Sequence, residues 1–341
     1  MPAEPASISA HCGALPDPRV ERTQGHLLLD IPTIGRCAVR CGGAGRTAMA
    51  TFGRAREPWL RTFLAVPRGI PSHDTFGRVF AAPGPDAFGA AFIAWVRAVA
   101  PQTVGQAVAI DGKTPRRTHD RIEGRAALHS VSARADAGGL VLGQVAVDDK
   151  ANEIVAIPQL LALLDVRGGT VTIDAMGCQT ASARQIVAQG GGYVLALQGT
   201  HPTLHDDVRA AFAAARATAF TGLAPQHHSA AKTTDKARGR RAIRRAWVIA
   251  DPARLAYGDE AGRWAGPGGS GLVAAQRRGG DQRRVEVRHY LLSAPLDAAT
   301  FGRIVRRHWG IENRRHWVRE VTRNEDASRS RAGHAARNLA A

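Results

Sequence analysis

The sequence predicts an α/β fold, in which a mixed β-sheet is flanked by helices and follows a small helical domain. Three observations predict it. Apolar residues have helical spacing up to about residue 100, hydrophobic strands alternate with helices between residues 107 and 215, and further strands precede a last helix that starts near residue 296. Alternation of strands and helices along a chain is typical of layered α/β domains.

Composition narrows the class of protein. The chain has 341 residues, of which 44% are hydrophobic, as in a globular protein of two or three units. It contains no apolar run of about 18 residues and no basic-then-apolar leader, so we expect a cytoplasmic protein without a membrane segment. The four cysteines are few and unevenly placed. Cys37 and Cys41 lack a second pair at zinc-like spacing, so we expect buried thiols and no disulfide scaffold.

The net charge indicates the kind of partner. The chain has 46 lysines and arginines but 29 acidic residues, a net charge of +17 that solubility alone does not require. Such an excess favours a polyanionic partner.

We predict five units along the chain. They are a disordered tail over residues 1–18, a helical N-terminal domain over 19–104, the first part of the α/β domain over 105–218, a basic β-rich insertion over 219–294 and a C-terminal helical part over 295–341. In the helical domain, Gly42 and Gly43 interrupt the helices, Ser72 or Asp74 caps one helix, and residues 88–99 have the spacing of an amphipathic helix.

Hydrophobic runs and turn signals predict the elements of the α/β domain. We expect strands at 107–111, 128–133, 140–147, 170–174 and 193–197, and helices from Pro158 to 164, at 180–188 and at 206–215. Residues 221–245 are polar and basic, which leaves two readings open, a solvated surface loop or a segment that contacts phosphates. The insertion contributes strands at 247–250 and 285–292, and the last helix opens at Leu296.

Two predicted strands end in aspartate. The strand at 170–174 alternates apolar residues with Thr170, Thr172 and Asp174, and the strand at 107–111 ends in Asp111. Taken alone, Asp174 can simply accept hydrogen bonds from the turn that follows it. Because two such strands can present both carboxylates at one edge of a sheet, the pattern also indicates a metal site.

Glu312 lies on the last predicted helix. His308, Glu312, His316 and Glu320, at steps of four residues, share a face that is separate from the apolar stripe. A surface glutamate paired with neighbouring arginines is one reading. A zinc site of His308, Glu312 and His316 is disfavoured, because the His-Glu-x-x-His arrangement of metalloproteases is absent.

Several motifs, taken in order, resemble those of a known family. They are AIDGK at 109–113, GLVLGQ at 139–144, NEI at 152–154, TIDAMGCQ at 172–179, YVLAL at 193–197, and HWGIEN at 308–313 followed by HW at 316–317. In combination they resemble insertion-sequence transposases of the H-repeat-associated group. The resemblance runs from about residue 17 to the C-terminus.

This resemblance implies a DDE transposase with a ribonuclease H-like core, which a β-rich insertion interrupts before the last helix. It implies that Asp111, Asp174 and Glu312 form a catalytic triad that holds two Mg²⁺ ions, with Mn²⁺ as a substitute, for DNA cleavage and strand transfer at insertion-sequence ends. The implied partners are double-stranded DNA, as terminal inverted repeats and target DNA, and a second copy of the chain in a homodimer on that DNA. The implied location is the nucleoid.

The basic segments would then grip DNA without reading its sequence. We expect DNA contacts from ten residues, which are Lys113, Arg238, Arg240, Arg241, Arg244, Arg245, Arg306, Arg307, Arg315 and Arg319.

The chain departs from the family pattern at residues 197–201, 237–242 and 319–323, and it ends early, at Ala341. These differences leave the three acids in place. They keep open an inactive or truncated remnant that binds DNA without cutting it. A ribonuclease H-like nuclease that lacks strand transfer is a third hypothesis.

Overall fold

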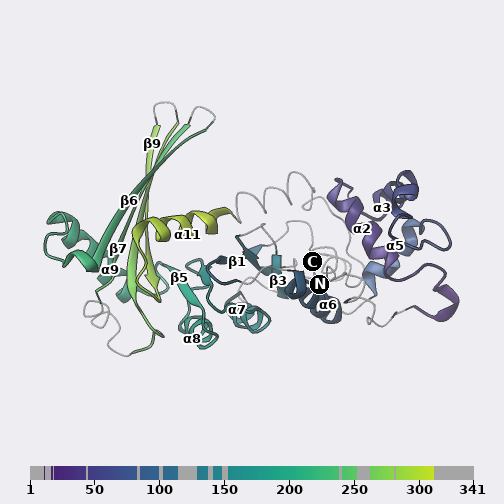
Figure 1. Ribbon diagram of the computed structural model, residues 1–341, viewed down its shortest axis with the longest axis horizontal. Helices are drawn as coiled ribbons and strands as arrows, with labels where there is room; N and C mark the ends of the chain where they lie inside the picture. The colour runs from purple at the N-terminus through teal and green to yellow at the C-terminus, as the bar shows by residue number, and fades with distance from the viewer. Residues whose placement is uncertain are drawn as a thin grey trace, which may run out of the picture.

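The computed structural model describes residues 11, 17, 19–43, 45–82, 85–99, 103–113, 129–136, 141–147, 153–237, 240–251, 262–279 and 282–310. Within these residues, an N-terminal helical domain is followed by a nine-stranded mixed sheet with helices on both faces, as predicted. Figure 1 shows the helical domain at one end of the molecule and the longest strands at the other. No helix in these ranges is both long and apolar enough to cross a membrane.

The N-terminal domain is a cluster of short helices. They are the 3-10 turn η1 (Glu21–Thr23) and the helices α2 (Asp30–Arg40), α3 (Gly45–Ala55), α4 (Glu57–Leu60) and α5 (His73–Ala81). The predicted interruption after α2 is confirmed, with Gly42 at a φ of +86° that favours glycine. The cap of α5 is Ser72, whose Oγ accepts the N–H of Thr75 at 3.2 Å. Cys41 follows α2 and is exposed, so the prediction that it is buried was wrong.

One turn of this domain has a strained backbone. Val66 has a φ of 40°, which is rare for a β-branched residue, and its side chain is buried. Its N–H donates to Oδ2 of the buried Asp30 at 2.9 Å. This buried hydrogen bond helps to hold the turn between α4 and α5 against α2.

Five strands form the first part of the sheet. They are β1 (Ala107–Lys113), β2 (His129–Ala135), β3 (Val141–Val147), β4 (Thr170–Ile173) and β5 (Gly192–Leu197), in the spatial order β3-β2-β1-β4-β5. β1 pairs in parallel with β4, and β4 in parallel with β5, whereas β2 runs antiparallel to both of its neighbours. Helix α6 (Pro85–Val99) leads into this part and buries Ile93 and Val96.

Four long strands extend the same sheet. They are β6 (His228–Ala237), β7 (Arg240–Ile249), β8 (Gly269–Gly279) and β9 (Gln282–Leu292), after the 3-10 turn η4 (Pro225–His227). β9 pairs antiparallel with β5, and the order continues as β9-β8-β7-β6. The strands predicted at 247–250 and 285–292 lie largely within β7 and β9. The surface loop considered for 221–245 was wrong, because these residues form most of a hairpin that is polar where it faces water.

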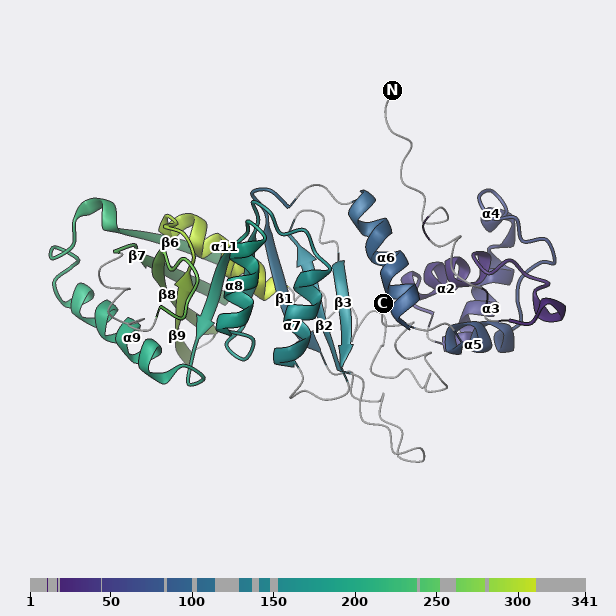
Figure 2. The ribbon, with the colours of Figure 1, turned by 90° about the horizontal axis from the view of Figure 1, so that it is seen from below.

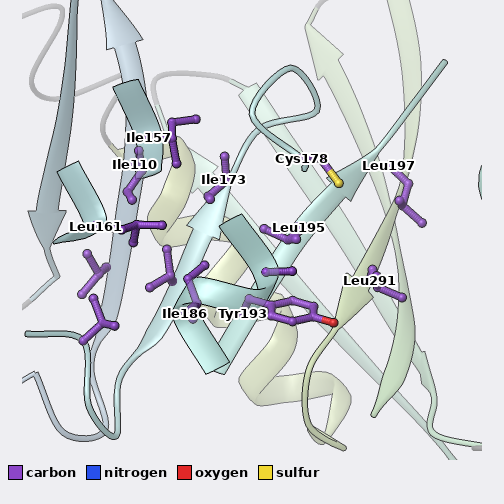
Figure 3. Packing of buried hydrophobic residues seen from close by; sticks show 14 of the residues in the cluster. Ile110, Ile157, Leu161, Ile173, Cys178, Ile186, Tyr193, Leu195, Leu197 and Leu291 are labelled. Atoms are coloured by element: carbon purple, nitrogen blue, oxygen red, sulfur yellow. The ribbon is translucent and has the colours of Figure 1, made fainter. Parts of the chain in front are cut away.

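Helices cover the two faces of the sheet. One face packs on α7 (Glu153–Ala162), α8 (Thr180–Ala188) and α9 (Pro202–Ala217), as Figure 2 shows for α7 and α8. Figure 3 shows Ile110, Ile157, Ile173 and Tyr193 in this core. The opposite face packs on α11 (Ala298–Gly310), with Phe301 against Tyr290.

The start predicted for the helix after residue 152 was wrong. Pro158 lies inside α7 and does not begin it. Ala156, Ile157, Leu160 and Leu161 are all buried on this helix, and their packing offsets the hydrogen bond that proline cannot donate.

Candidate active site

Asp111 and Asp174 lie at neighbouring positions of adjacent strands. Ile110 on β1 is paired with Ile173 on β4 in a parallel register, so the residue after each is an aspartate. Adjacent strands lie about 4.8 Å apart. Ile110 and Ile173 point into the core beneath α7 (Figure 3), and the alternation of side chains therefore turns both aspartates towards the face covered by α11.

The backbone orients each carboxylate. Oδ1 of Asp111 accepts the N–H of Gly112 at 2.9 Å, and Oδ1 of Asp174 accepts the N–H of Gly177 at 3.0 Å. The turn contact considered for Asp174 therefore exists. It does not exclude a metal site, because a carboxylate has several acceptor positions.

The turn after β4 requires a glycine. A Cβ on Gly177 would lie 2.4 Å from Ile157 Cδ1 and 2.4 Å from Ile173 Cγ2. The neighbouring Cys178 is buried, and burial, followed by the charge of Asp174, raises the pKa of its thiol to about 12. This thiol stays protonated and is no nucleophile.

His308 on α11 reaches the strand that ends in Asp174. Its Nδ1 lies 2.8 Å from Oγ1 of Thr172. Burial lowers the pKa of His308 to about 4, although the nearby charge of Asp174 acts in the opposite direction. The imidazole is therefore neutral near pH 7.

Glu312, the third acid of the implied triad, lies outside the described residues, as do His316 and Glu320. Helix α11 is described as far as Gly310, two residues before Glu312. Among the described side chains, no three histidines, cysteines or acids form a group that could hold a metal. The structure thus brings together two of the three acids.

The basic residues predicted to bind DNA lie in different settings. Arg244 and Arg306 both pair with Asp235, and Arg307 pairs with Asp136 at 2.6 Å. Arg245 is exposed on β7. Lys113 is the last residue of β1, and Arg240 and Arg241 begin β7, while Arg238, Arg315 and Arg319 lie outside the described residues.

A basic groove runs between α11 and the sheet, with a volume of about 830 Å³. The groove is open because small residues line its walls, among them Ala107 and Ala109 on β1. Within the described ranges, its basic lining residues are Arg134, Lys232, Arg244, Arg277, Arg288, Arg303, Arg306 and Arg307, and its acidic ones are Asp136 and Glu286. We call this the α11 groove, and it approaches Asp111 along β1.

Comparison with known families identifies the chain. Residues 102–341, well over half of its length, match the family model described as the transposase DDE domain. The chain belongs to the DDE transposase family. Residues 9–96 of the transposase match the model described as DDE_Tnp_1-associated, which covers the helical domain.

Relatives of the transposase extend over most of its length. The H repeat-associated putative transposase YhhI of Escherichia coli strain K12 is 35% identical over 336 residues, which cover 96% of this chain and 86% of the relative. An uncharacterized protein in the dhlA 3' region of Xanthobacter autotrophicus is 47% identical over 238 residues, which cover 69% and 77%. The resemblance to the H-repeat-associated group is thereby confirmed.

Among solved structures, the piggyBac transposase in a synaptic complex with hairpin DNA aligns with a TM-score of 0.43 and 11% identity. The alignment covers 92% of this transposase and 63% of that chain, which is less than two thirds of its length.

The sequence had not indicated several basic residues that line the α11 groove. Arg134, Lys232 and Arg277 were not among the predicted DNA contacts, because their place in one groove depends on strands that lie far apart in the chain. Arg288 was missed as well. Its guanidinium lies 3.7 Å over the ring of Trp309, in a cation–π contact between β9 and α11.

Proposed function

We propose that this transposase cleaves and joins DNA at insertion-sequence ends with divalent metal ions held by Asp111, Asp174 and Glu312. The register of β1 and β4 carries the proposal, because it sets two carboxylates side by side on the face that α11 covers. Glu312, two residues beyond the described end of α11, would complete the set.

The donor set fits the metal. Carboxylate oxygens are the ligands that Mg²⁺ and Mn²⁺ prefer, and Asp111 and Asp174 offer them at a partly buried position. A pair of such ions supplies activation of the attacking oxygen and stabilises the departing one. Asp111, on the central strand β1, Asp174 and Glu312 would together hold the ions. The backbone N–H groups of Gly112 and Gly177 pre-orient the two aspartates.

The topology supports a ribonuclease H-like core. The order β3-β2-β1-β4-β5, in which only β2 of these five strands runs antiparallel, places the two aspartates on central parallel strands. The strands β6 to β9 lie between α9 and α11 in the sequence, where the resemblance implies a β-rich insertion.

The α11 groove supports DNA as the substrate. Its basic side chains outnumber its acidic ones, and its wall on β1 includes Ala109, two residues before Asp111. Arginine and lysine side chains of this kind hold phosphates and release counterions, so binding should weaken steeply with salt. Assembly as a homodimer on DNA stays a prediction.

Cleavage of DNA that carries the element's terminal repeats tests the proposal. The wild-type chain should give cut and joined products with Mg²⁺, and Asp174→Asn should lower the rate about a thousand-fold, since a lost metal ligand costs several kcal/mol of transition-state stabilisation. Asp206→Asn, which changes an exposed acid on α9, is the matched control and should leave the rate unchanged.

The outcomes separate the hypotheses. Equal amounts of product from wild type and Asp174→Asn would show that Asp174 is not part of the catalytic site. Cut but never joined DNA would indicate a nuclease. Binding without cutting by the wild-type chain would indicate the inactive remnant.

A further inference from the structure

A hydrogen bond joins the last described helix to the strand before Asp174. Thr172 and His308 are 136 residues apart in the chain, and Oγ1 of the threonine lies 2.8 Å from Nδ1 of the histidine. Thr172 is only 2% exposed. Loss of its partner would leave this hydroxyl buried and unsatisfied, which is unfavourable, so the bond constrains both elements.

The bond lies next to the acid pair. Thr172 precedes Asp174 by two residues, so both side chains share one face of β4. Ala109 is in register with Thr172, two residues before Asp111.

Helix α11 is fixed differently along its length. Near its start, Phe301 packs on Tyr290 of β9, and a Cβ on Gly302 would lie 3.1 Å from the Cβ of Ala246 on β7. These contacts hold the helix to the strands of the insertion. His308, near the other end, connects it to β4.

We propose that His308 is a positioning residue, which fixes α11 against β4 through Thr172 and thereby holds the carboxylate of Asp174 beside that of Asp111 for metal binding. The inference rests on the proposed function of these acids. Groups that orient metal ligands commonly change metal affinity or activity by about 10–100-fold when they are removed. A displacement of about 1 Å at such a site has effects of that size.

The proposal differs from simple packing because it depends on the hydroxyl of Thr172 and the Nδ1 atom of His308. Thr172→Val keeps the shape of the side chain and removes the hydroxyl, whereas Thr172→Ser keeps the hydroxyl and removes a methyl group. His308→Asn keeps a polar atom near the place of Nδ1, and His308→Phe keeps the ring volume without it.

Thr170→Val is the matched control. It makes the same substitution on the same face of the same strand, two residues farther from Asp174. Thr170 is partly exposed, and its pairing partner across the sheet is Gly192 of β5.

The test measures metal binding separately from catalysis. The full-length variants are titrated with Mn²⁺, and the metal-induced rise in Tm gives the half-saturating concentration. The Mg²⁺ concentration for half-maximal cleavage and the affinity for DNA in EDTA are measured in parallel.

We expect Thr172→Val and His308→Phe to need about 10–100-fold more metal than wild type in both titrations. Thr172→Ser and Thr170→Val should stay within about threefold of wild type, and His308→Asn should recover part of the loss seen with His308→Phe. All should bind DNA in EDTA as wild type does.

Equal metal requirements for Thr172→Val and Thr172→Ser would overturn the inference. Parallel loss of DNA binding and of the folded state in Thr172→Val and His308→Asn would also overturn it, since the contact would then serve stability alone. A normal metal response of Asp174→Asn would instead remove the proposed function itself, so the two failures are distinguishable.

Discussion

Arg307 on α11 and Asp136 at the end of β2 form an ion pair, with 2.6 Å between Nη1 and Oδ2. Both line the α11 groove. Asp235 on β6 similarly accepts Arg244 and Arg306. Carboxylates of the protein thus pair with several of the arginines that the sequence predicts to bind DNA.

Removing Asp136 should release Arg307 for a phosphate. We expect Asp136→Asn to bind duplex DNA more tightly at low salt, and the slope of log affinity against log salt should steepen by about 0.9 for the added phosphate contact. Fluorescence anisotropy between 50 and 200 mM salt measures both quantities, with Asp165→Asn as a control for the loss of one exposed charge. Weaker binding by Asp136→Asn would show that the pair serves to hold α11 in place.

Gly177→Ala should destabilise the transposase and impair cleavage. The added Cβ would lie 2.4 Å from atoms of both Ile157 and Ile173, so the turn that donates its N–H to Asp174 must shift. Overpacking of this kind costs about 1–3 kcal/mol, which urea denaturation measures.

The control is Gly199→Ala, whose Cβ would meet nothing within 4 Å and which should change stability by less than about 0.5 kcal/mol. Equal stability of the two alanine variants would contradict the crowding around Gly177.

Stability should fall in mild acid. His289 is buried on β9 beside His205, and burial, followed by the charges of His205 and Arg209, lowers its pKa from 6.5 to about 4. Between these values the unfolded chain binds a proton that the folded chain excludes, so the free energy of unfolding decreases as pH falls from 6.5 towards 4.

The loss from this residue should be on the order of 3 kcal/mol and nearly complete at pH 4. Urea denaturation at several pH values measures it, and His289→Gln should flatten the curve across this window. An unchanged slope in His289→Gln, equal to that of the control His73→Gln, which alters an exposed side chain on α5, would assign the acid sensitivity to other groups.

Local patterns in the sequence predicted much of this fold. The alternation around Asp174, the helix at 180–188 and the cap of α5 each depend on residues a few positions apart, and the structure has all three. Pro158 was misplaced because buried neighbours keep α7 helical before it. Residues 221–245 looked like a loop because β6 and the first half of β7 are polar and carry few apolar residues that could alternate.

The candidate site was predicted less completely. The sequence predicted that Asp111 and Asp174 end strands, but β1 continues to Lys113, and only Asp174 directly follows the end of its strand. Only the pairing of Ile110 with Ile173 shows that the two strands are adjacent and parallel. His308 was placed on the face that carries Glu312, while its contact with Thr172 joins segments 136 residues apart. No periodicity along a single segment encodes such a contact.

The position of β9 has a consequence for synthesis of the chain. It is the last strand in the described sequence, yet it lies in the middle of the sheet, where Ser293 accepts the N–H of Tyr193 from 100 residues earlier. At ribosomal speeds of about 5–20 residues per second, β5 would wait roughly 5–20 s with one side unpaired. During that interval the nascent transposase exposes the unpaired edge of β5, which can pair with other chains. Binding of chaperones should therefore peak before residue 292 emerges.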